Sequence, residues 1–98
     1  MIRIGIVDDE KIFRDRIAHL VTEILSPESM ETEIRTYPDG SSFLAAGQTV
    51  GPCDILLADI QMAGLDGMEL GKKIRRDHPG MYIIFITSYE EYAAESYR

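Results

Sequence analysis

The sequence predicts an α/β domain in which a parallel sheet is covered by helices on both faces. Short apolar segments rich in β-branched residues alternate along the chain with segments whose apolar residues recur at helical spacing. The central apolar segments are continuous rather than alternating, which is typical of strands buried in a parallel sheet. The chain has 98 residues, enough for one domain.

In the first half of the chain, residues 2–7 form an apolar run that stops at the acidic residues 8–10, and this run predicts a buried strand. Apolar residues then recur every three or four positions over 13–24, which predicts a helix closed by the Ser-Pro pair that follows. Residues 31–37 alternate less regularly and predict an outer strand. A Pro-Asp-Gly turn then leads to a short helix around 43–45.

In the second half, residues 53–58 predict a second buried strand, which also stops at an acid, Asp59. A loop with two glycines follows, and then a helix over 68–77 that a His-Pro-Gly sequence breaks. Residues 81–86 predict a third buried strand, and 90–97 predict a last helix. Strands and helices therefore alternate from one end of the chain to the other.

Composition limits the classes of function. Seventeen Asp and Glu against ten Lys and Arg give a net charge of -7, which argues against nucleic acid binding through a basic face. The single cysteine, Cys53, cannot form an intramolecular disulfide and fits a reducing compartment. We find no signal peptide and no apolar run long enough for a membrane span, so a cytoplasmic domain is expected. Neither histidine has a second ligand at zinc spacing.

Polar residues follow the buried strands. Asp8 and Asp9 follow the first, Asp59 the second and Thr87 the third. Ligands of open parallel sheets bind at the carboxyl ends of strands, so the acids converge if the first two buried strands are neighbours. Each acid taken singly could be a solvated loop residue or a helix cap. Together they predict a Mg²⁺ site, and Mg²⁺ beside a further carboxylate suits phosphoryl transfer.

Four motifs at these positions match one family in order, spacing and strand context. They are IVDDE at 6–10, DILLADIQM at 54–62, GLDG at 64–67 and FITS at 85–88. Together they resemble the receiver domain of two-component response regulators. The combination is specific, although each motif alone is weak.

The resemblance implies a flavodoxin-like, doubly wound parallel sheet with strand order 2-1-3-4. It also implies that Asp59 accepts phosphate from a sensor histidine kinase. Mg²⁺ would be held by Asp8, Asp9, Asp59 and the backbone carbonyl of Gln61, with Asp9 as a direct ligand and Asp8 often acting through water. Thr87 would be the switch hydroxyl that moves to bond the phosphoryl group.

Receivers of this family have five strand–helix units, and this chain stops in what would be the fourth helix. Residues 1–98 are therefore interpreted as one receiver domain that lacks the fifth strand, the fifth helix, the lysine that pairs with the phosphoryl group, and an effector domain. The sequence near 38–40, after Asp59 and at 88–97 resembles regulators with a LytTR-type DNA-binding effector. We expect transcriptional control through that effector, with no contact of this domain with nucleic acid or membrane. Because 81–86 would be an edge strand, we also expect self-association.

Two other functions remain open from the residues. A small Mg²⁺-dependent phosphohydrolase could use Asp59 as its nucleophile, although Gln61 stands where such enzymes carry a second acid. A binding module could act by protein contacts without phosphorylation. The receiver interpretation implies no enzyme beyond self-phosphorylation and self-dephosphorylation.

Overall fold

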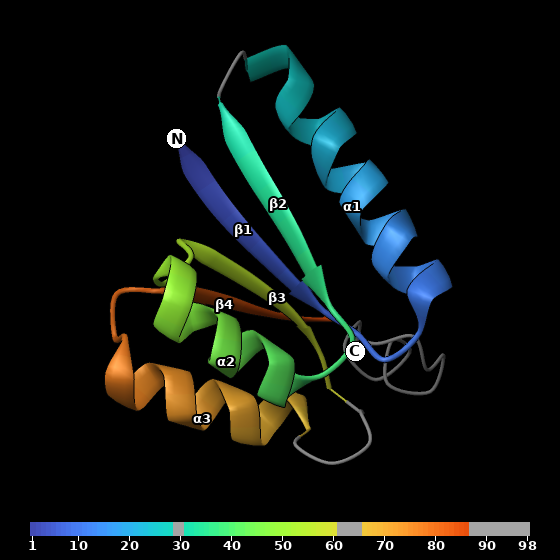
Figure 1. Ribbon diagram of the computed structural model, residues 1–98. Helices are drawn as coiled ribbons and strands as arrows, with labels where there is room; N and C mark the ends of the chain where they lie inside the picture. The colour runs from blue at the N-terminus through green and yellow to red at the C-terminus, as the bar shows by residue number, and fades with distance from the viewer. Residues whose placement is uncertain (29–30, 61–65, 87–98) are drawn as a thin grey trace, which may run out of the picture.

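The computed structural model describes residues 1–28, 31–60 and 66–86 (Figure 1). Four strands form one sheet in the order β2-β1-β3-β4, and all three strand pairs are parallel. The sheet confirms the predicted fold class and strand order. The strands are β1 (Ile2–Val7), β2 (Thr32–Tyr37), β3 (Ile55–Asp59) and β4 (Tyr82–Ile86), and the helices of the described residues are α1 (Lys11–Leu25), α2 (Gly40–Val50) and α3 (Gly67–Asp77), with a short 3₁₀ turn at Ser26–Glu28.

The helices cover both faces of the sheet, with α1 on one side and α2 and α3 on the other (Figure 1). On the first face, apolar residues of α1 pack on Ile4, Ile6 and Leu57. On the second face, Val7 and the neighbouring residues of β3 pack beneath α2 and α3. The side chains buried there are Val7, Phe43, Leu56, Ala58, Leu70, Ile74 and Met81.

The helix predicted around 43–45 is longer than expected and spans Gly40–Val50. Its N-cap is Asp39, whose Oδ1 accepts a hydrogen bond of 2.7 Å from the Ser42 N–H. Its aromatic residue, Phe43, packs so closely over β1 that a Cβ at Gly5 would lie 2.9 Å from the ring. Gly5 therefore lets α2 approach the centre of the sheet. The helix predicted over 90–97 lies outside the described residues.

The position of β1 between β2 and β3 determines where the acids lie. Val7, its last residue, pairs with Tyr37 of β2 and with Ala58 of β3. Asp8, the residue after Val7, therefore follows β1 at the level of Asp59, the residue after Ala58 and the last of β3. Since the strands are parallel, Asp8 and Asp59 emerge at the same edge of the sheet.

The β4 strand is the outer strand of the described sheet, beyond β3. Tyr82 and Ile84 point to the face that carries α1, and their side chains are 73% and 51% exposed. α1 packs mainly over β1 and β2, and these two side chains stay exposed to solvent. No helix in the described part of the chain is long and apolar enough to cross a bilayer.

We expect the 98-residue chain to self-associate through β4, because an apolar edge strand without charge or proline is a template for a second strand. Light scattering over a concentration series should give a mass that rises above 11.1 kDa. Ile84→Lys places a charge on the exposed face of β4 and should shift the mass toward that of the monomer. A wild-type chain that stays monomeric at high concentration would show this prediction to be wrong.

Candidate functional site

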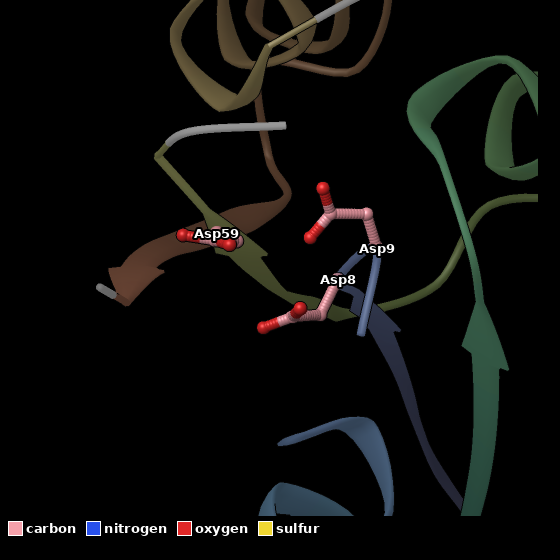
Figure 2. Close-up of side chains that lie close together, drawn as sticks. All are labelled: Asp8, Asp9 and Asp59. Carbon is pink, nitrogen blue, oxygen red and sulfur yellow. The ribbon is translucent and has the colours of Figure 1, made fainter. Parts of the chain in front are cut away.

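Three carboxylates meet at the carboxyl ends of β1 and β3 (Figure 2). Asp8 and Asp9 follow β1 directly, and Asp59 is the last residue of β3. One carboxylate oxygen from each residue lies within 4.8 Å of the others. Asp8 and Asp59 are each only 3% exposed, whereas Asp9 is open to solvent. The three acids therefore lie together, as the sequence predicts. The other two predicted site residues, Gln61 and Thr87, lie outside the described residues.

Asp8 is fixed by three hydrogen bonds, to the last residue of β2, to the N-cap residue of α1 and to the first turn of α1. Its N–H donates to the Tyr37 carbonyl of β2 at 3.2 Å, and its Oδ1 accepts from the Glu10 N–H at 2.9 Å. Its backbone carbonyl accepts from Nη1 of Arg14 at 2.8 Å. No motif in the sequence distinguishes Arg14 from the other charged residues of α1.

The electrostatics of the cluster disfavour the charged form of Asp8. Burial raises the pKa of this carboxyl group above its usual value, and the charges of Asp9 and Glu10 raise it further. The Glu10 N–H and the Arg14 guanidinium lower this pKa, but the net direction is upward. A cation bound between the carboxylates would relieve the repulsion that they share.

The first turn of α3 packs against the end of β3. The Gly67 N–H donates to the Ile60 carbonyl at 3.1 Å, and a Cβ at Gly67 would clash with the Asp59 carbonyl oxygen. Only glycine allows so close an approach. Asp66 serves as the N-cap of α3, because its Oδ1 accepts from the Glu69 N–H at 2.8 Å. Asp66 is thus engaged in the helix rather than in the acid cluster.

The chemistry of the three carboxylates fits a hard divalent cation. Mg²⁺ prefers oxygen ligands, and it is usually bound by one or two carboxylates together with water. Asp9 offers an exposed oxygen beside two buried ones, so water can complete the coordination from the solvent side. Zinc would favour nitrogen or sulfur ligands, whereas the three residues of this cluster offer only carboxylate oxygens.

We expect Asp8→Asn to stabilise the cation-free chain at pH 7, because burial and the neighbouring acids disfavour the charge that asparagine removes. A raised pKa means that the folded state binds the Asp8 proton more tightly than the unfolded state does. Stability therefore falls as pH rises from the ordinary value of 3.8 through the higher folded value. Asparagine removes the charge but keeps an oxygen for the Glu10 N–H.

Urea unfolding in EDTA, at pH 7 and at pH 3, measures this difference between the two proteins. The advantage of Asp8→Asn should shrink at the lower pH, where Asp8 is protonated in both the folded and the unfolded state. An equal advantage at both pH values would show that the charge of Asp8 is not its cause.

Comparisons with known proteins agree with this geometry. The profile of the response regulator receiver domain matches residues 4–97. The positive alginate biosynthesis regulatory protein of Pseudomonas aeruginosa is 32% identical over 95% of this chain and 36% of its own length. The sensory transduction protein LytT of Bacillus subtilis is 30% identical over 99% of this chain and 38% of its own length.

Among solved structures, the response regulator TrrA of Thermotoga maritima in complex with Mg²⁺-BeF is 34% identical. It superposes with a TM-score of 0.68 over 97% of this chain and 76% of that chain. The same protein is also known in complex with the histidine kinase ThkA, with 35% identity and a TM-score of 0.68 over 91% of this chain and 71% of that chain.

The chain spans less than half the length of these two curated relatives, at 36% and 38%. The profile match nevertheless covers nearly all of its residues, and the fold and the acid cluster agree with it. The chain belongs to the family of response regulator receiver domains of two-component systems.

Proposed function

We propose that this receiver domain accepts phosphate from a sensor histidine kinase on the carboxylate of Asp59, with Mg²⁺ held by the acid cluster. One observation carries the proposal. Asp59 is a buried carboxylate at the end of β3, and an oxygen of each of Asp8 and Asp9 lies within 4.8 Å of one of its own oxygens. A nucleophile and the ligands of a charge-neutralising cation therefore share one site.

In the proposed reaction, an oxygen of Asp59 attacks the phosphorus atom of the donor. An oxygen–phosphorus bond forms, the bond between phosphorus and the donor histidine nitrogen breaks, and its electron pair stays on the imidazole. Asp8, Asp9 and Asp59, with the backbone carbonyl of Gln61, would hold the Mg²⁺. When bound, this ion supplies positive charge to the phosphoryl oxygens. The structure of TrrA with Mg²⁺-BeF supports this proposal.

The kinase must reach Asp59, so its docking surface must border the acid cluster. The first residues of α1 follow the acids directly, and the outer side of this helix carries exposed apolar residues. Ile12, Leu20 and Ile24 are 70%, 49% and 68% exposed. The complex of TrrA with its histidine kinase supports a kinase as the partner. We propose that this side of α1 contributes to that contact.

We further propose that the chain is the receiver part of a longer, cytoplasmic transcriptional regulator. The resemblance to regulators with LytTR-type effectors and the presence of LytT among the relatives support this. The effector, rather than this acidic domain, would bind DNA. Phosphorylation would alter the receiver surface and so control the effector.

Thr87 is the proposed switch hydroxyl, since it follows Ile86, which pairs with Asp59 across β3 and β4. In the full-length regulator, Thr87→Ala should still accept phosphate, because Asp59 makes the attack. It should activate transcription poorly, whereas Thr87→Ser keeps the hydroxyl and should retain output. Acetyl phosphate labelling and a transcription reporter measure the two steps separately. Loss of labelling in Thr87→Ala would mean that Thr87 is needed for the chemistry itself.

A single comparison separates the three candidate functions. The full-length regulator is incubated with acetyl phosphate and Mg²⁺, and separately with p-nitrophenyl phosphate. A receiver gives a stable phosphoprotein and little turnover of the monoester. A phosphohydrolase gives steady monoester turnover, and a module that works without phosphorylation gives neither signal.

A further inference from the structure

The guanidinium of Arg14 links α1 to the end of β1. Arg14 lies one turn into α1 and is half-buried, and its Nη1 donates to the backbone carbonyl of Asp8 at 2.8 Å. Its own N–H donates to the Glu10 carbonyl at 3.0 Å. Arg14 therefore stabilises the connection between β1 and α1 through hydrogen bonds of both its backbone and its side chain.

The contact between Arg14 and the Asp8 carbonyl fixes the backbone between Asp8 and Asp9. The Asp8 carbonyl belongs to the peptide plane that leads to Asp9, so holding this oxygen holds the plane. Asp8 itself is already fixed by the Tyr37 carbonyl and the Glu10 N–H. Asp9 is solvent-exposed and is not buried by packing. The orientation of Asp9 therefore depends on the peptide plane that Arg14 holds.

Charge alone would give Arg14 the opposite effect. A guanidinium near the carboxylates repels a second cation, so it would weaken Mg²⁺ binding if it acted only through its field. A positioning role strengthens Mg²⁺ binding, because it holds the ligands in place before the ion arrives. The two roles predict changes of opposite sign when Arg14 is replaced.

We propose that Arg14 is a positioning residue for the metal site. It holds the Asp8 carbonyl and thereby keeps Asp9 directed toward the space that it shares with Asp59. The inference rests on the proposed Mg²⁺ role of these acids. Loss of the Arg14 side chain should weaken Mg²⁺ binding even though a competing positive charge is lost with it.

Arg16 provides a matched control on the same helix. It carries the same charge two residues further along α1, and its guanidinium lies 5.7 Å from the ring centre of Phe13 on the exposed side. Arg16→Met removes one positive charge without touching the contact at Asp8. Its Mg²⁺ affinity should be unchanged or slightly higher than that of the wild type.

Isothermal titration calorimetry with MgCl₂ on the full chain tests the proposal. Arg14→Met should weaken Mg²⁺ binding by about tenfold, as expected when a residue that orients a ligand is removed. Arg14→Lys keeps a donor and the charge, and it should recover at least part of the affinity. If Arg14→Met does not fold, Arg14→Gln, whose side chain is too short to hold the carbonyl, takes its place with the same expected loss.

Urea unfolding in EDTA separates positioning from stability, because a purely structural role would lower stability and leave the Mg²⁺ affinity unchanged. Affinity in Arg14→Met equal to or tighter than in the wild type would overturn the positioning role. A wild-type chain whose Mg²⁺ binding is absent, or is unaffected by Asp9→Ala, would instead overturn the proposed metal site.

Discussion

Asp59→Asn is expected to reduce phosphorylation of the full-length regulator by at least roughly 100-fold, equivalent to about 2.7 kcal/mol of barrier. Asparagine has nearly the same shape, so the sheet and the neighbouring acids should stay in place. Its amide oxygen is a far weaker nucleophile than a carboxylate, and it cannot form the acyl phosphate. Asp8 and Asp9 remain nearby, but neither lies at the end of β3, where the phosphoryl group must arrive.

Intact mass spectrometry after incubation with acetyl phosphate and Mg²⁺ measures this loss directly. Asp54→Asn is the matched control, because Asp54 precedes β3 at the opposite end of the strand. There its Oδ2 accepts a hydrogen bond of 2.8 Å from the Arg3 N–H, which an asparagine oxygen can also accept. Asp54→Asn should be labelled like the wild type. Equal labelling of Asp59→Asn and the wild type would remove Asp59 as the acceptor.

The apolar runs predicted the sheet, and β1 and β3 are largely buried as expected. The prediction of a third buried strand was wrong for β4, which exposes Tyr82, Ile84 and Phe85. The helices between the strands force parallel crossovers. The extent of α2 was not predicted, since Gly40–Val50 is rich in small residues that carry no apolar period. Its start depends on the Asp39 cap, which the sequence alone also allowed as a turn.

At the candidate site, the sequence identified which acids meet but not how each is held. Asp8 and Asp9 are adjacent and chemically identical, yet one is buried and the other exposed. This difference arises from the turn that the chain takes after β1. The contact of Arg14 with the Asp8 carbonyl depends on the same turn, so helical spacing could not predict it. The close approach of Gly67 to Asp59 likewise depends on tertiary packing.

Asp9→Ala is expected to remove most of the stabilisation that Mg²⁺ gives to the fold. An ion that binds only the folded state at 100 times its dissociation constant adds about 2.7 kcal/mol. For a domain of this size, each kcal/mol corresponds to roughly 4–8 °C in Tm. Because Asp9 is exposed, its truncation should cost little by itself, and without Mg²⁺ it relieves repulsion with Asp8.

Asp66→Ala should show the opposite pattern, which makes it a useful control for Asp9→Ala. Asp66 caps α3, so its loss should lower the stability of the cation-free chain by about 1 kcal/mol. It lies outside the acid cluster, and its Mg²⁺-induced rise in Tm should equal that of the wild type. Thermal melts with EDTA and with increasing MgCl₂ measure both quantities in each variant. Equal Mg²⁺-induced shifts in Asp9→Ala and the wild type would show that Asp9 does not bind the ion, since removal of a direct ligand must weaken the ion's preference for the folded state.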